Sequence, residues 1–348
     1  MNERSVNTFS AGALLCSGKN RTKAGGGVLS KQASLPAAAK DAGIKPSRSA
    51  VMRRIRKNWD LYLLIAPVIA FFIIFEYVPM YGVQIAFKNF IATKGIWGSP
   101  WVGFRHFERF FESYYFWRLL KNTLGIGLYQ LFVGFPVPIV LALMINEVRS
   151  KKFSRFVQTV TYAPHFLSTV VMVGILMIFL SPQTGLLNNV ITWIRGEPIE
   201  FLTEPAWFKS IYVLSGVWQQ MGWSSIIYLA ALTGIDPQQH EAARVDGANR
   251  WQRIWHINLP GIMPTITILL ILNMGSLLSV GFEKVFLMQN SLNMQASDII
   301  STHVYRKGII DGQYSYSAAV GLFNSIVNFI LLVVVNRIAR KVNDTSLW

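Results

Sequence analysis

Cysteine and charge are both scarce in this chain of 348 residues. Cys16 is its single cysteine, which excludes an intramolecular disulfide and a metal site built from several cysteines. Charged residues make up only 14% of the chain and apolar residues 52%, whereas an average soluble domain is about 25% charged. A soluble fold with so few charges could not cover so much apolar surface, and the composition therefore indicates contact with lipid.

The sequence also lacks the usual signatures of catalysis. Its five histidines are scattered, no HExxH spacing occurs, and no glycine-rich phosphate loop ends in Lys-Ser or Lys-Thr. We therefore predict that the chain is not an enzyme, has no catalytic or metal-binding residues, and holds no cofactor of its own. Any energy that its activity requires must then come from a partner subunit.

Six runs of the sequence are long enough to cross a membrane as helices, which takes about 20 residues each. Only the first run contains a charge, Glu76, and all are too long and continuous for the alternating strands of a membrane barrel. The sequence therefore predicts an all-α, polytopic membrane protein with six transmembrane helices. The six runs are 61–87, 122–146, 156–194, 210–235, 254–282 and 312–336.

Basic residues predict how these spans are oriented. Of the 33 Lys and Arg residues, 22 lie in the termini and in the two loops on the same side, and 11 lie on the other side. By the positive-inside rule, both termini are cytoplasmic. The net charge of +16 then reflects anchoring to membrane lipid rather than binding to nucleic acid. Residues 1–50, rich in Ala, Gly and Ser, are expected to be a disordered cytoplasmic tail before a transmembrane domain over 51–348.

One loop on the cytoplasmic side, 234–264, has unusually complete helix signals. Asp236 is a good N-cap, Pro237 fits the first helical position, and Gln239 occupies the position of a capping-box partner. Gly247 suits the left-handed residue that ends a helix, and we expect a second short helix over 249–257 that ends before a proline. This helix–turn–helix, with small residues on one face, either docks on a partner or folds over its own bundle, and these signals leave both open.

The 234–264 loop resembles the EAA loop of ABC-importer permeases. The pattern in that family is E-A-A, three residues, G, nine residues and I-x-L-P, and this chain has EAA at 241–243, Gly247 and INLP at 257–260. The resemblance implies a coupling helix that sits in a cleft of a cytoplasmic ABC ATPase dimer, which uses the ATP and Mg. The residues that carry this expected role, with the charges at their rim, are Glu241, Ala242, Ala243, Arg244, Asp246 and Gly247.

The resemblance extends over about 61–348, through strings such as YVPMYGVQIAFKNF, VTYAPHFLSTVV and GVWQQMGWSSIIYLAAL. The chain resembles the permeases of oligosaccharide and polysaccharide importers, a group that is similar to one subunit of the bacterial alginate importer. This similarity implies a type I ABC importer permease fold in the bacterial cytoplasmic membrane. It also implies a second, different permease chain and an extracytoplasmic sugar-binding protein as partners.

Polar and aromatic residues inside the spans are candidates for a substrate path, because amides that face lipid are costly. Amides beside Trp and Tyr rings suit a sugar, whose hydroxyls form hydrogen bonds and whose C–H faces stack on aromatic rings. The same amides are also able to join helix to helix. The candidates are Tyr129, Gln130, Trp218, Gln219, Gln220, Asn273, Asn324 and Asn328. Beyond the fifth span, Glu283 and Lys284 are expected to form an ion pair or a gate contact.

An ion-coupled secondary sugar carrier, which works alone, is a different class of function. Such a carrier usually has an acidic residue within the membrane. Glu76 is the only acid in the six runs, and it lies near the end of one. The sequence therefore favours a subunit of an ATP-driven importer over a carrier.

Overall fold

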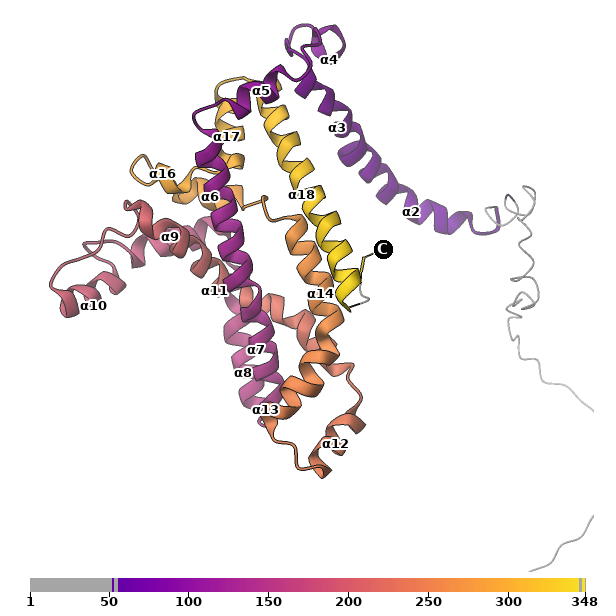
Figure 1. The fold of residues 1–348 in the computed structure, drawn as a ribbon, viewed down its shortest axis with the longest axis vertical. Coiled ribbons are helices and arrows are strands. Elements are labelled where there is room, and N and C mark those ends of the chain that lie inside the picture. Colours follow the sequence, from indigo (N-terminus) through magenta and orange to yellow (C-terminus); the bar gives the residue numbers. More distant parts are fainter. Residues whose placement is uncertain (1–51, 53–55, 344–345, 348) are drawn as a thin grey trace, which may run out of the picture. The chain divides into compact units, whose positions relative to one another are not determined.

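The computed structural model describes residues 52, 56–343 and 346–347 (Figure 1). These residues form helices joined by loops, with no β-strand among them and one isolated bridge between Lys88 and Trp101. The predicted all-α class is therefore confirmed for this part of the chain. The disordered tail predicted over 1–50 lies outside the described residues. The chain divides into two compact units, Met1–Ala70 and Phe71–Trp348.

The first long helix runs over Trp59–Phe87 and begins in the first unit. It consists of α2 (Trp59–Phe72), η2 (Ile73–Tyr77), α3 (Val78–Met80) and η3 (Tyr81–Phe87). No residue of α2, η2 or α3 is buried. So large an apolar surface requires lipid or another protein to cover it, as expected for the first predicted span.

Three helices of the second unit are also long and apolar enough to cross a membrane, and they run over Phe116–Glu147, Arg250–Gly275 and Tyr314–Lys341. Their parts are α6 (Phe116–Tyr129), η4 (Gln130–Gly134), α7 (Pro136–Glu147), α13 (Arg250–Arg253), η6 (Ile254–Asn258), α14 (Leu259–Gly275) and α18 (Tyr314–Asn343). α14 packs along α18, and α7 packs along α11 (Pro205–Thr233). These pairs build the bundle that positions the candidate sites.

Wide π turns accommodate prolines in the long helices. A proline lacks the N–H for the bond to the carbonyl four residues back, and its ring clashes with that carbonyl. The π turns η2, η4 and η6 end two residues before Pro79, Pro136 and Pro260, respectively. At η6, the Leu259 N–H bonds to the carbonyl of Ile254, five residues back. The widened turn leaves room for the ring, so that the helix continues past the proline.

The third predicted span, 156–194, is not one helix. The elements in this region are α8 (Lys151–Tyr162), η5 (Ala163–Phe166), α9 (Thr169–Phe179) and α10 (Leu186–Arg195). The helix formed by α8 and η5 lies at 102° to α9. Pro164 opens the tight turn at the bend, and the Ser168 hydroxyl caps α9 by accepting a hydrogen bond from the Val171 N–H (3.3 Å). The prediction of a single span is therefore wrong: the bent pair is at most one broken span, and residues 180–194 lie outside it.

α11 contains most of the fourth predicted span and has 29 residues. It is less apolar than the four long helices because glutamines and serines interrupt it. It packs against α6, α7, α8 and α14, so that protein covers much of its surface. The described residues thus contain four helices that are long and apolar enough to cross a membrane, or five when the bent pair is counted as one broken span. α11 lies in the fourth span predicted from the sequence and is the remaining one of the six.

Short helices lie at both ends of the second unit. Figure 1 shows α5 and α17 at one end of the bundle and α12 and α13 at the other. An aromatic cluster of Phe110, Phe116 and Phe323 joins α5, α6 and α18, with ring centroids 5.1 and 5.5 Å from Phe110. The short elements are α4 (Gly95–Gly98), α5 (Arg105–Phe111), α12 (Pro237–Val245), α15 (Phe282–Met288), α16 (Met294–Ser297), α17 (Ile300–Tyr305) and η7 (Arg306–Ile310).

Candidate functional site

The first helix of the 234–264 loop begins and ends where the sequence predicts. The Asp236 carboxylate caps α12 by accepting a hydrogen bond from the Gln238 N–H (2.9 Å). Gly247 has a φ of +78°, a left-handed conformation that side chains with a Cβ adopt at a cost. The capping box expected at Gln239 forms one helix later, at the start of α13. There, Asn249 and Gln252 exchange side-chain to backbone hydrogen bonds of 2.8 and 2.9 Å.

The second helix of the loop does not end at residue 257, and this prediction was wrong. α13, η6 and α14 form one continuous helix over Arg250–Gly275. The sequence prediction treated Pro260 as a stop, but the π turn over Ile254–Asn258 widens the helix just before it. The loop is therefore joined directly to a helix that is long and apolar enough to span a membrane.

α12 presents its residues to solvent. None of its nine residues is buried, and Val245 is 88% exposed. Glu241, Ala242 and Arg244 are exposed, and Ala243 is half-buried. A helix that folds over its own bundle would bury one face, and α12 buries none. Of the two readings left open by the helix signals, this exposure favours docking on a partner.

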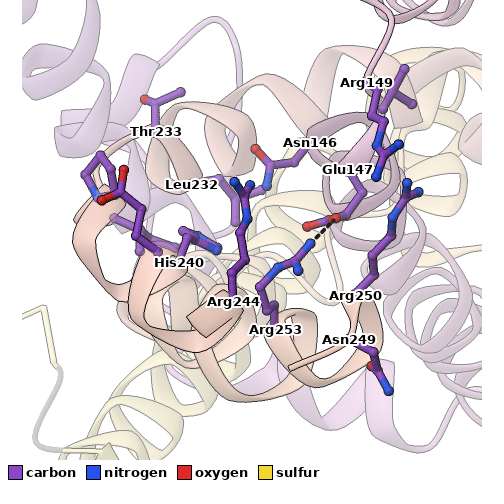
Figure 2. Close-up of a pocket in the computed structure, with 14 residues that line it drawn as sticks. Asn146, Glu147, Arg149, Leu232, Thr233, His240, Arg244, Asn249, Arg250 and Arg253 are labelled. Atoms are coloured by element: carbon purple, nitrogen blue, oxygen red, sulfur yellow. Dashed lines mark ion pairs between the residues drawn. The ribbon is translucent and has the colours of Figure 1, made fainter. Parts of the chain in front are cut away.

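α13 is tied to the end of α7. The Arg253 guanidinium forms an ion pair with the Glu147 carboxylate (3.5 Å; dashed in Figure 2), and the Asn258 amide donates a hydrogen bond to the same carboxylate (3.3 Å). These contacts flank a cavity of about 940 Å³ between α12, α13 and the end of α7. Arg244 and His240 of α12 also line this cavity. The 234–264 loop is thus connected to two long helices, α7 and α14.

Three of the predicted path residues line a second cavity, of about 450 Å³: Gln130, Gln220 and Asn273. Trp223 lines it as well, and the His165 ring stacks on Trp223 at 4.4 Å between centroids. The Nδ1 atom of His165 lies 3.0 Å from the side-chain oxygen of Gln220. The cavity therefore combines amides with aromatic faces.

His165 and Trp223 were not among the predicted path residues. A signal for both is present in the sequence, because each is an aromatic or imidazole ring within an uncharged run, as Trp218 is. Trp218 itself is half exposed and does not line this cavity.

Other predicted path residues join segments of the bundle. The Gln219 amide donates a hydrogen bond to the Leu167 carbonyl (3.0 Å). The Asn328 oxygen accepts one from the Leu278 N–H (3.0 Å). These contacts are the helix-joining role that the sequence also allowed. Tyr129 packs against an apolar core cluster, and the side-chain oxygen of Asn324 is buried.

Lys284 contacts α11 and not its neighbour Glu283. Its ammonium donates a hydrogen bond to the Tyr212 carbonyl (2.9 Å) and lies 4.8 Å from the centroid of the Tyr212 ring. The ion pair that the sequence allowed with Glu283 does not form among the described residues. Lys284 is buried and holds α15 against α11.

Comparisons with known proteins agree with this architecture. Residues 134–344 match the family described as binding-protein-dependent transport system inner membrane component. Protein LplB of Bacillus subtilis is 47% identical over 297 residues, covering 85% of this chain and 93% of that protein. The polygalacturonan/rhamnogalacturonan transport system permease protein YteP of the same organism is 45% identical over 320 residues, covering 91% of this chain and 100% of that protein.

A solved structure shares the fold. The crystal structure of a bacterial alginate ABC transporter, in complex with an alginate pentasaccharide-bound periplasmic protein, contains a chain that matches with a TM-score of 0.79 and 43% identity. The match covers 85% of this chain and 99% of that one. The apolar helices and these similarities identify an integral membrane protein. The chain belongs to the family of binding-protein-dependent transport system inner membrane components.

Proposed function

We propose that this chain is the permease subunit of an ATP-driven importer of oligosaccharides or polysaccharide fragments. Its family membership carries the transport role, and the names of its relatives support the substrate class, because polygalacturonan, rhamnogalacturonan and alginate are all polysaccharides. A second, different permease chain completes the path. An extracytoplasmic sugar-binding protein delivers the substrate, as the periplasmic protein in the alginate complex supports. The chain lies in the bacterial cytoplasmic membrane with both termini in the cytoplasm, as its basic residues indicate.

The 234–264 loop is the proposed contact with a cytoplasmic ABC ATPase dimer, which binds the ATP and Mg. The exposure of α12 supports this role, since Ala242 leaves room for close approach and Glu241 and Arg244 offer charges at the rim. The Arg253–Glu147 ion pair and the continuity of α13 with α14 provide the mechanical connection. A movement of the ATPase would thereby reach α7 and α14 together.

The cavity lined by Gln130, Gln220, Trp223 and Asn273 is the proposed part of the substrate path in this chain. Its amides suit sugar hydroxyls, and the half-exposed ring of Trp223, which stacks on His165 with its other face, suits the C–H face of a sugar ring. A second permease would supply the opposite wall of the path.

Reconstitution into vesicles tests the importer against the alternative of an ion-coupled carrier. Purified chain alone is expected to transport no oligosaccharide with or without an ion gradient. Uptake should require the second permease, the ATPase, the binding protein and ATP together. Uptake by this chain alone, driven by a proton or sodium gradient, would establish the carrier and exclude the importer.

Substitutions on α12 test the coupling contact. Glu241→Lys reverses a charge and Ala242→Trp blocks close approach, and both positions are exposed, so that the chain should accumulate normally. The amount of ATPase that co-purifies and the transport-linked ATP hydrolysis should both fall. Glu108→Lys makes the same charge reversal at an exposed position of α5, at the other end of the bundle, and should leave both unchanged. Normal ATPase binding in both α12 variants would end this assignment.

A further inference from the structure

Two arginines, Arg250 within the 234–264 loop and Arg149 beside it, have no acidic partner among the described residues. Arg149 lies between α7 and α8, and Arg250 begins α13; both side chains are exposed. Figure 2 shows the two side chains extending toward one another at the edge of the cavity that both line. Glu147, which lines the same cavity, is already paired with Arg253 (3.5 Å). Two like charges that converge in this way favour an anion between them.

An apolar groove begins at the same two arginines. The groove has a volume of about 760 Å³, and Arg149, Arg250 and Glu147 line its mouth. Its walls come from one face of α7 and from the start of the Arg250–Gly275 helix. The side chains that matter here are Val140, Leu143, Met144, Trp251, Ile254 and Trp255. Met144, Trp251 and Trp255 are 64%, 71% and 61% exposed, so that this chain leaves the groove uncovered.

The groove has the length and the position of a lipid chain. α7 has 12 residues, which at 1.5 Å per residue gives about 18 Å; one leaflet of a membrane has a hydrocarbon depth of about 15 Å. Two spans, Phe116–Glu147 and Arg250–Gly275, have their ends at the mouth. From these span ends we expect the arginines at the boundary with water and the groove at the depth of the acyl chains. Tryptophan prefers the membrane interface, and Trp251 and Trp255 lie in the first turns of the Arg250–Gly275 span.

We propose that this groove binds an anionic glycerophospholipid. Its phosphate lies between Arg149 and Arg250, and one acyl chain fills the groove against Val140 and Met144. A free phosphate would leave the apolar walls uncovered, and an acidic protein segment would not need an apolar groove at acyl-chain depth. The bound lipid would bridge α7 and α13, the same two elements that the Arg253–Glu147 pair connects. This proposal rests on the proposed function in one respect only, the assignment of the lipid to the cytoplasmic leaflet of the membrane.

Photo-crosslinking in the assembled transporter tests this site. A benzophenone amino acid replaces Met144 in the full chain, co-expressed with its partner subunits, in vesicles of equal phosphatidylglycerol and phosphatidylethanolamine. Adducts at Met144 should be enriched roughly 25-fold in phosphatidylglycerol, because each of the two arginines contributes on the order of fivefold near an anionic headgroup. A benzophenone at Phe132, which is 73% exposed and lies outside the groove, should react with both lipids equally.

Charge variants then assign the preference to the two arginines. Arg149→Gln combined with Arg250→Gln should bring the ratio at Met144 close to one. Lys152→Gln combined with Arg155→Gln removes two exposed charges of α8 that line neither cavity, and should keep the enrichment. Val140→Trp, which fills the groove and leaves both arginines, should reduce adducts of both lipids.

Two results would overturn the site. One is an equal yield of the two lipids at Met144 in the unsubstituted chain, and the other is a crosslink from Met144 to a protein subunit. The measurement needs no ATP and no sugar. A failure here therefore leaves the transport result untouched, and a failure of transport leaves the lipid result standing.

Discussion

Asp298 is the buried charge whose removal should destabilise this protein most. Its side chain is fully buried and contacts two guanidiniums, those of Arg118 on α6 (3.0 Å) and of Arg306 on η7. The Thr302 hydroxyl donates a hydrogen bond to the same carboxylate (3.3 Å), and the Asn122 amide donates one to the Asp298 carbonyl (3.1 Å). This single carboxylate therefore joins α6, α17 and η7 at the end of the bundle opposite the 234–264 loop.

The substitution Asp298→Asn should lower the free energy of unfolding by about 3 kcal/mol. Breaking a buried ion pair costs about 3–5 kcal/mol because a charge is left without its partner. The side chains of Arg118 and Arg306 are 29% and 27% exposed, so that water offsets part of the loss and the lower end of the range applies. The apparent Tm of the purified transporter in detergent, at one scan rate, should fall by roughly 6–12 °C.

Asp311→Asn is the matched control for this substitution. Asp311 pairs with Lys307 (2.7 Å) four residues away, and both side chains are about a third exposed. Such a surface pair contributes about 0.3–0.5 kcal/mol, which corresponds to a Tm change of roughly 1–2 °C. If both variants shift the Tm equally, or if Asp298→Asn shifts it by less than about 2 °C, the reasoning from burial is refuted.

Two further predictions concern acid stability and helix packing. Burial lowers the pKa of His303 from its ordinary value of 6.5 to about 4, so the folded state keeps the ring neutral, 3.2 Å from the Tyr316 hydroxyl. The contribution of His303 to stability should be full above pH 6.5 and decline toward pH 4. In the His303→Gln variant, the Tm should therefore change less with pH over this range. Equal slopes of Tm against pH in the variant and the unsubstituted chain would contradict the prediction. Gly222→Ala would place its Cβ 2.1 Å from the Thr161 carbonyl and should lower stability by about 1–3 kcal/mol. Gly174→Ala, with no atom within 4 Å, should be neutral or stabilising in the same Tm assay; a similar loss in both would argue against close helix packing at Gly222.

The first helix of the 234–264 loop was predictable because its signals are local. An N-cap at Asp236 and a left-handed glycine at Gly247 act within one turn of the helix that they bound. The end of the second helix was not predictable in the same way. Pro260 is a helix terminator by its own chemistry, but a π turn over the preceding residues removes the clash, and the packing of the surrounding bundle selects that turn.

The bend in the third predicted span has a related cause. An uncharged run of 39 residues, 156–194, gives no reason in hydropathy alone for a break. Pro164 and Ser168 supply the turn and the new N-cap, but both residue types also occur inside continuous membrane helices. The helix of α8 and η5 lies at 102° to α9. α8 packs against α11, where the absence of a side chain at Gly222 permits close approach to Thr161, and such a long-range contact cannot be read from the hydropathy of the run.

The substrate path shows most clearly where sequence reasoning ends. Gln219 and Gln220 are neighbours in α11 and have the same chemistry, yet one bonds to the Leu167 carbonyl and the other lines the cavity with Trp223. Neighbouring residues of a helix point about 100° apart, and here Gln219 points to the Leu167 carbonyl whereas Gln220 faces the cavity. Helices cover α11 on several sides, and the pattern of apolar residues along it therefore does not mark one face as the path. The choice between Gln219 and Gln220 is made by the turn that presents the Leu167 carbonyl, 52 residues earlier in the chain, and this contact exists only once α8, α9 and α11 have packed together.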